Sequence, residues 1–150
     1  MKEQPTNIRL MRPGDFDAVV AIDERILKTA RPEYYEVKFE KIVESSDSLP
    51  ISLVAENRDG SVVGFVMGEL YMGQYGIFES EATIDTIGVD PQAQQHSLGR
   101  QLIDAFVDHV SRIGVRKIRT LVSADDKKLT KFFKSNQFSP SRNVNLERAL

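Results

Sequence analysis

The sequence has 150 residues, enough for one domain with a sizeable core, and its composition is that of a globular protein, so we expect a single domain over 1–150. The absence of cysteine excludes disulfides, thiolate metal sites and cysteine nucleophiles, and two histidines argue against a histidine-based metal site. A net charge of -2 gives no indication of a nucleic-acid partner. No apolar run is long enough to span a membrane and no secretory leader is visible, so we expect a cytoplasmic location.

The first half of the chain predicts one strand, two helices and a β-hairpin. Apolar side chains at helical spacing mark both helices, and Pro32 falls in the first turn of the second helix, where proline is tolerated. The dipeptide Asp59-Gly60 is a strong hairpin signal between the next two strands. The expected elements are a strand at 7–11, helices at 16–29 and from 32 onward, strands at 51–56 and 62–70, and a loop at 71–80.

The stretch from 81 to 113 predicts a strand, a polar turn and an amphipathic helix. Residues 81–89 are rich in β-branched side chains and stop at the turn dipeptide Asp90-Pro91. Apolar residues then recur at helical spacing from Leu98 onward. A tight turn that leads into a helix presents free backbone N–H groups at the positive end of the helix dipole, which suits a phosphate or pyrophosphate.

The remaining residues predict a strand at 117–123, a helix capped by Asp125 or Asp126, and a final strand at 143–149. A strand–helix–strand connection of this length implies a parallel pair with a right-handed crossover. The order is therefore β-α-α-β-β-β-α-β-α-β, an α/β fold with a mixed sheet, without repeats or an interdomain linker.

Val89-x-Pro91, followed by Gln94-x-x-Ser97-x-Gly99 and an apolar helix, resembles motif A of the GNAT N-acetyltransferases, and the order of elements resembles that family's fold. The resemblance implies acetyl-CoA as co-substrate and a sheet that splays at the cofactor site. The family has a glycine where this chain has Ser97, whose N–H still donates and whose hydroxyl is available to cap the helix, although glycine reaches unusual φ more easily. The cofactor contacts implied here are Ile87, Gly88, Val89, Gln94, Gln95, His96, Ser97, Leu98, Gly99 and Arg100.

The candidate catalytic residue is Asp85. A carboxylate in a central strand is costly to bury unless it is paired, so its position asks for an explanation. Two explanations stay open, a general base that acts directly or through water, and a structural carboxylate bonded to a neighbour. The glutamate that family members often carry on this strand corresponds to Thr83, so the resemblance does not assign the base.

Two residues of the last helix differ from the family pattern. Asp126 stands where an asparagine often contacts the cofactor, and the resemblance assigns that contact to it. Phe133 stands where a tyrosine commonly protonates the departing thiolate, and phenylalanine cannot donate a proton. We therefore expect Phe133 to pack either beside the cofactor sulfur or simply in the core.

Charge is unevenly distributed along the chain. Residues 14–90 carry 16 acidic and 6 basic side chains, and residues 91–150 carry 11 basic and 5 acidic ones. If the halves do not interleave in space, the basic half suits a phosphate-rich cofactor and the acidic half a cationic substrate.

We interpret the chain as an N-acetyltransferase that transfers an acetyl group from acetyl-CoA to a primary amine, of a small molecule or a peptide, by direct attack in a ternary complex. The alternative is a non-catalytic acyl-CoA-binding or sensing module of the same fold, which the departures at Ser97 and Phe133 would fit. A generic α/β nucleotide-binding domain is disfavoured by the antiparallel strands before the crossover. We expect no nucleic-acid or membrane partner, and a homodimer is possible.

Overall fold

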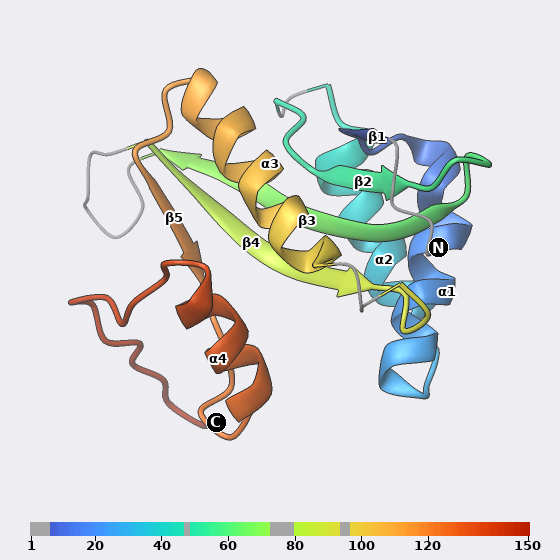
Figure 1. Cartoon of the computed structure of the whole chain (residues 1–150). Coiled ribbons are helices and arrows are strands. Elements are labelled where there is room, and N and C mark those ends of the chain that lie inside the picture. Colours follow the sequence, from blue (N-terminus) through green and yellow to red (C-terminus); the bar gives the residue numbers. More distant parts are fainter. Residues whose placement is uncertain (1–6, 47–48, 73–79, 94–96) are drawn as a thin grey trace.

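The computed structural model describes residues 7–46, 49–72, 80–93 and 97–150, and it is built around a five-stranded mixed sheet (Figure 1). Neighbouring strands are antiparallel from β1 to β4, and β4 and β5 are parallel. The order across the sheet is the order along the chain, β1 (Asn7–Leu10), β2 (Leu53–Glu56), β3 (Val62–Met72), β4 (Ser80–Val89) and β5 (Lys117–Thr120).

Helices cover both faces of this sheet. After the short 3-10 turn η1 (Pro13–Asp15), α1 (Phe16–Leu27) and α2 (Pro32–Lys38) pack on one face, and α2 continues into the π-helical turn η2 (Phe39–Val43). The second face is covered by α3 (Leu98–Arg112), and α4 (Lys127–Ser135) follows β5. The core therefore has two parts, one on each face of the sheet. On β3, Phe65 and Met67 pack in the part under α1 and α2, and Val66 packs in the part under α3.

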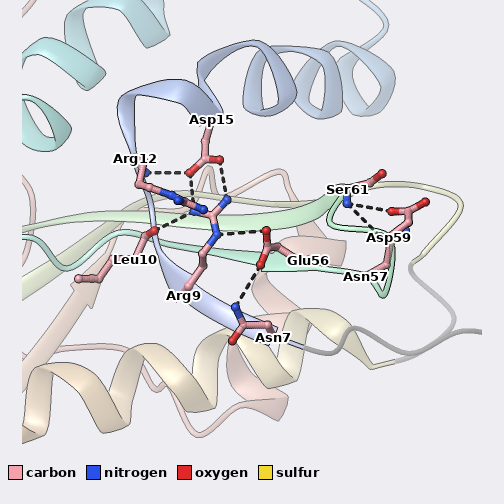
Figure 2. A network of polar contacts seen from close by, with 9 residues as sticks. All are labelled: Asn7, Arg9, Leu10, Arg12, Asp15, Glu56, Asn57, Asp59 and Ser61. Atoms are coloured by element: carbon pink, nitrogen blue, oxygen red, sulfur yellow. Dashed lines mark hydrogen bonds and ion pairs between the residues drawn. The ribbon is translucent and has the colours of Figure 1, made fainter.

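The first strand is fixed to the helical face by the Arg9 side chain, as Figure 2 shows. Its guanidinium donates two hydrogen bonds of 2.9 Å to Asp15 and lies 3.2 Å from a Glu56 oxygen. Burial by itself would raise the pKa of Asp15, but the bonds from Arg9 and from the Arg12 backbone N–H outweigh it and hold that pKa below its ordinary value. This network joins β1, η1 and β2.

The predicted elements up to the last helix are confirmed, with shifted ends. The strand β5 stops at Thr120 instead of residue 123, and β3 extends to Met72 instead of ending at 70. Residues 73–79 of the expected loop lie outside the described residues. No helix in the described ranges is long and apolar enough to cross a membrane.

The strand expected at 143–149 was a wrong prediction, because residues 143–150 form neither strand nor helix in the structure. Alternation alone does not make a strand, since a strand needs a neighbour for its hydrogen bonds and a surface for its apolar side chains. Here Val144 and Leu146 stay 80% and 88% exposed. The segment lies outside the sheet of the single chain.

Candidate functional site

The sheet opens between β4 and β5. These strands pair only over Glu81–Ile84, and the Thr120 hydroxyl closes the paired part by donating a 2.9 Å hydrogen bond to the Ile84 carbonyl. Past this point β4 continues for five residues to Val89, paired with β3 on its other side, while β5 has ended. Figure 1 shows the two strands diverging from their shared end. The predicted splay is confirmed, and residues 85–89 border it.

A β-bulge stands where the opening begins. In the register of β3 and β4, Met67 faces Thr86 and Gly68 faces Ile84, so Asp85 is the extra residue on β4. A bulge re-aims the side chains around it. The residues before the bulge alternate normally, whereas the bulge places both Asp85 and Thr86 towards the face covered by α1 and α2. The mid-strand carboxylate therefore occupies an irregular position in β4.

Asp85 is held by two hydrogen-bond donors on that face. The Lys38 ammonium lies 2.9 Å from Asp85 Oδ2, and the Thr83 hydroxyl donates to Asp85 Oδ1 over 3.1 Å. Both charged side chains are largely buried, with 21% of Lys38 and 17% of Asp85 exposed. Burial alone would lower the pKa of Lys38, but the hydrogen bond and charge of Asp85 outweigh it and raise that pKa above its ordinary value.

Other polar groups extend this cluster along the same face. Lys38 also lies 5.8 Å from the centre of the Tyr34 ring, within reach of a cation–π interaction. On β3, Glu69 accepts a hydrogen bond from the Tyr71 hydroxyl and lies 3.3 Å from the Lys41 ammonium. The Thr86 hydroxyl is buried and finds no hydrogen-bond partner in the described part of the chain. The acidic face of the sheet is thus partly neutralised by lysines from α2 and η2.

The start of α3 follows the open half of β4. Ser97 is the N-cap residue and has left-handed backbone angles, φ 55° and ψ 28°, the conformation that glycine adopts most easily. Its side chain makes no capping hydrogen bond, so the expected hydroxyl cap was a wrong prediction. The Ser97 carbonyl accepts a hydrogen bond of 3.1 Å from the Gln101 N–H, the first backbone bond of the helix. The N–H groups of Leu98, Gly99 and Arg100 precede it in the first turn, where the helix itself provides no carbonyl to accept from them.

Two glycines among the predicted cofactor contacts are required by packing. A Cβ on Gly99 would stand 2.9 Å from the Phe132 ring of α4, and a Cβ on Gly88 would stand 2.6 Å from the Phe65 ring of β3. Both distances are shorter than real Cβ contacts allow. Gly99 therefore sets the close approach of α3 to α4, beside the predicted phosphate site.

The remaining predicted cofactor residues have mixed positions. Ile87 and Val89 pair with β3 and pack on the α3 core, Leu98 is fully buried, and Arg100 is 73% exposed. Gln94, Gln95 and His96 lie outside the described residues. The described part of the motif thus combines core positions with a helix start at the open end of β4.

In the last helix, Asp126 is a capping residue and Phe133 is a core residue. The Asp126 carboxylate accepts from the Leu129 N–H over 3.0 Å, as an N-cap should. Phe133 is 4% exposed and its ring lies 5.4 Å and 5.1 Å from those of Phe132 and Phe138. The core alternative for Phe133 is therefore the one that the geometry favours.

The outer face of α4 is basic. Three lysines at helical spacing line a shallow hollow together with Ala124 and Thr130, and they are Lys127, Lys131 and Lys134. Part of the basic charge of the second half of the chain therefore lies on α4, the same helix whose Phe132 packs on Gly99. The arrangement suits a ligand that carries several phosphates.

Comparison of the sequence with known families identifies the family of this chain. Residues 16–138 match the model of the acetyltransferase (GNAT) family. No curated protein matches the sequence significantly.

Several solved structures share the fold. The aminoglycoside N-acetyltransferase AAC(6')-Iy in complex with CoA has 19% identity and a TM-score of 0.78, covering 99% of this chain and 97% of that one. An aminoglycoside acetyltransferase from an uncultured soil metagenomic sample, in complex with sisomicin, has 17% identity and a TM-score of 0.72, with coverage of 96% and 95%. A transcriptional regulator from Bacillus halodurans C-125 has 18% identity and a TM-score of 0.77, with coverage of 96% and 99%.

Proposed function

This chain belongs to the acetyltransferase (GNAT) family and is an acetyl-CoA-dependent acyltransferase; we propose that it transfers the acetyl group to a primary amine by direct attack in a ternary complex. The observation that carries the proposal is the opening beyond Ile84, where β4 loses β5 as a neighbour and runs on to the start of α3. An extended ligand with amide groups can pair with a strand edge of this kind.

We assign acetyl-CoA to this opening in three parts. The pantetheine amides would pair with the backbone of 85–89, and the pyrophosphate would accept from the N–H groups of Ser97, Leu98, Gly99 and Arg100. The lysines of α4 would attract the remaining phosphate charge. Gln94, Gln95 and His96 complete the proposed pyrophosphate loop. Asp126 caps α4 and Phe133 is buried in the core. We therefore propose that these two residues stabilise and position α4 beside the cofactor.

We assign the general base to Asp85. The neutral amine attacks the thioester carbonyl carbon, the C–N bond forms, and the C–S bond breaks as the thiolate leaves. The ammonium proton passes to Asp85 or to a water that Asp85 orients. Lys38 and Thr83 fix the carboxylate by hydrogen bonds of 2.9 and 3.1 Å, which a positioned base requires.

The leaving thiolate has no tyrosine donor at position 133 in this proposal. A thiol with a pKa of roughly 8.5, the cysteine reference, is already a fair leaving group. Water can then supply the proton, and the Tyr71 hydroxyl, which donates to Glu69 on the α2 face, is the alternative donor.

The proposed acceptor is a cationic small-molecule amine. The acidic groups Asp85 and Glu69 share one face of the sheet with lysines whose ammonium groups they already bind, which supports recognition of an ammonium there. Two of the structural neighbours are named as aminoglycoside acetyltransferases, a polyamine substrate class. A peptide amine is the second acceptor class, and the cytoplasm is the proposed location.

The proposal is tested by following thiol release from acetyl-CoA against a panel of aminoglycosides, polyamines and peptides. Turnover with any amine, and acetylated product by mass spectrometry, is the expected result. Saturable binding of acetyl-CoA by calorimetry, without turnover on any amine, would instead support the non-catalytic module. Absence of binding at millimolar acetyl-CoA would overturn the cofactor assignment.

A further inference from the structure

The ion pair between Lys38 and Asp85 puts a primary amine of the chain itself on the proposed general base. The Lys38 ammonium nitrogen lies 2.9 Å from Asp85 Oδ2. A general base has to lie within about 2.6–3.2 Å of the atom whose proton it takes. Lys38 therefore meets the distance requirement that the proposed function sets for the attacking nitrogen of an acceptor.

Both oxygens of the Asp85 carboxylate are engaged by side chains of the chain. Oδ2 binds the Lys38 ammonium, and Oδ1 accepts from the Thr83 hydroxyl over 3.1 Å. An external amine can reach this carboxylate once it displaces one of these donors. Until then, Lys38 is the amine that Asp85 holds at the border of the opening between β4 and β5.

The protein core fixes the position of the Lys38 backbone. Lys38 is the last residue of α2, and it lies between the buried side chains of Tyr35 and Phe39, which are 0% and 2% exposed. Its own side chain is 21% exposed and passes 5.8 Å from the centre of the Tyr34 ring. An amine that is attached and oriented in this way needs no binding step, and orientation raises the rate of attack.

Lys41 provides an internal reference for Lys38. It lies three residues further along in η2, and its ammonium is 3.3 Å from a Glu69 oxygen. Glu69 faces Thr83 in the strand register, so both lysines pair with carboxylates on the same face of the sheet. Lys41 is 63% exposed, however, and the proposed function assigns no proton transfer to Glu69.

We propose that Lys38 is a modification site, and that the chain acetylates it from its own bound acetyl-CoA when no external acceptor is present. This inference rests on the proposed function, which supplies the acetyl donor and the base. The Lys38 ammonium gives one proton to Asp85, and the neutral nitrogen attacks the thioester carbonyl carbon. The C–N bond forms and the C–S bond breaks. The departing thiolate receives the second nitrogen proton through water, and Asp85 releases the first proton to solvent.

Uncatalysed acetylation would select the two lysines in the opposite order. The neutral amine is the nucleophile, so a protonated and shielded lysine reacts slowly with an acetylating reagent. Burial by itself would lower the pKa of Lys38, but Asp85 outweighs burial and raises that pKa above its ordinary value. Lys38 is therefore mostly protonated and largely buried, whereas Lys41 is exposed. Which lysine reacts first separates catalysed from uncatalysed acetylation.

The first test incubates the full chain with acetyl-CoA alone and follows both lysines by peptide mass spectrometry. Lys38 should be acetylated faster than Lys41, by roughly 10²-fold, the lower end of what a positioned base contributes. The rate constant for Lys38 should not depend on protein concentration, because the reaction is intramolecular. S-acetyl-N-acetylcysteamine, a thioester without the nucleotide, should acetylate Lys41 first. Faster acetylation of Lys41 by acetyl-CoA, or a Lys38 rate that scales with protein concentration, would overturn the proposal.

Two matched variants assign the modification in the intact protein. Lys38→Arg keeps a cation for Asp85 but has no amine to acetylate, so the early mass increase of one acetyl group should disappear. Lys41→Arg should keep that increase at the wild-type rate. In Asp85→Asn, acetylation of Lys38 should slow by about 10²–10⁴-fold. An early mass increase that persists in Lys38→Arg would contradict the assignment.

The last test reads the position of Lys38 without acyl transfer. Bromoacetyl-CoA carries a carbon that an amine can alkylate by displacing bromide, while the thioester stays intact. Alkylation of Lys38 in preference to Lys41 is the expected result, and alkylation of Lys41 alone would overturn the proposal. Turnover of free amines with Lys38 unmodified would overturn this inference and leave the proposed function standing. If neither a free amine nor Lys38 is acetylated, both are overturned.

Discussion

Lys38 of α2 and Asp85 of the β4 bulge form an ion pair with an N–O distance of 2.9 Å at the point where β4 and β5 separate. The pair links the helix that covers one face of the sheet to the residue that borders the opening. This pairing explains the carboxylate structurally, whereas the proposed function makes it the general base. The two interpretations of Asp85 therefore need a variant that separates them.

Asp85→Asn is that variant. The amide oxygen keeps an acceptor for Lys38 or Thr83, so the fold should persist, but the side chain no longer accepts a proton. We expect turnover to fall by about 10²–10⁴-fold, the usual contribution of a positioned base, with acetyl-CoA affinity little changed. Steady-state kinetics and calorimetry measure the two quantities. Thr83→Val is the control, since it removes one hydrogen bond and leaves the carboxylate. Turnover equal to wild type in Asp85→Asn would leave the carboxylate with a structural role alone.

Lys38→Met should separate stability from acceptor recognition. Removing the ammonium leaves a largely buried carboxylate without its cation, so we expect a loss of roughly 1–3 kcal/mol, between the values for exposed and buried pairs. The oxygen of Asp85 that Lys38 occupied is then free to accept from the ammonium of the acceptor, so the KM of the acceptor should fall. Chemical denaturation and initial rates measure the two effects. Lys41→Met is the matched control, because Lys41 is 63% exposed and its pair with Glu69 should contribute less than about 1 kcal/mol. An unchanged KM would show that the acceptor does not contact the Asp85 oxygen that Lys38 binds.

Much of this site followed from the sequence. The polar turn before a helix at Leu98, the parallel crossover and the splay were all predicted from local patterns and the family resemblance. The bulge was missed, although it left a signal. Apolar residues on the α3 face of β4 fall at Ala82, Ile84, Ile87 and Val89, with one step of three residues among steps of two. That single step marks the extra residue at Asp85.

The features that could not be predicted depend on contacts between distant segments. Lys38 lies 47 positions before Asp85, and no local pattern joins an α2 residue to that carboxylate. The packing of Gly99 on the Phe132 ring likewise depends on how α3 and α4 meet. Residues 143–149 show the opposite case, since their alternation is genuine but they pair with no strand in the described part of the chain. Local pattern predicts the ability to form a strand, whereas pairing requires a neighbour.

Ser97→Gly tests the strained start of α3. A non-glycine residue in the left-handed region costs about 1–2 kcal/mol, while glycine increases the entropy of the unfolded chain by roughly 0.4–1 kcal/mol. The free energy of unfolding should therefore rise by about 0–1.6 kcal/mol, and acetyl-CoA should bind at least as tightly, because the backbone N–H remains. Denaturation and calorimetry test both parts. Ser97→Ala is the control, since it keeps the strain and removes a hydroxyl that makes no capping bond. A marked loss of cofactor affinity in both variants would assign the hydroxyl a direct role.

Low pH should destabilise the fold, because it protonates carboxylates that are paired with cationic side chains in the folded state. The two hydrogen bonds from Arg119, of 2.7 and 3.0 Å, hold the pKa of Glu81 below its ordinary value. A carboxyl whose pKa is lower in the folded state than in the unfolded chain stabilises the fold fully at pH values above its unfolded pKa. This stability is lost as the pH falls through the folded-state pKa. Melting temperatures should thus drop as the pH decreases below about 4.5.

Arg119→Gln should weaken that acid dependence, because Glu81 then loses its principal partner. Thermal scans between pH 3 and pH 7 compare the slopes of the two proteins. Asp108→Asn, which removes a helix-surface pair with Arg112 that is 61% and 77% exposed, should leave the slope near wild type. Parallel slopes for wild type and Arg119→Gln would show that Glu81 does not contribute to the acid limb.

Phe133→Tyr tests whether the last helix can supply the missing acid. Phe133 is 4% exposed and stacks edge-to-face with Phe132 and Phe138, so a hydroxyl added there enters an apolar cluster. Burying it without a partner should cost about 1–3 kcal/mol. Turnover of the folded fraction should stay near wild type, because a buried hydroxyl does not reach the departing thiolate.

The same variant has a second outcome if the ring borders the cofactor sulfur. In that case acetyl-CoA would restore the lost stability, and turnover would rise because a donor now stands beside the thiolate. Melting with and without acetyl-CoA, together with thiol release, separates the outcomes. Phe138→Tyr, at a partly buried position, is the control and should cost less stability. A large loss of turnover with intact folding and cofactor binding would contradict both, since it would require that the apolar ring itself shapes the reacting geometry.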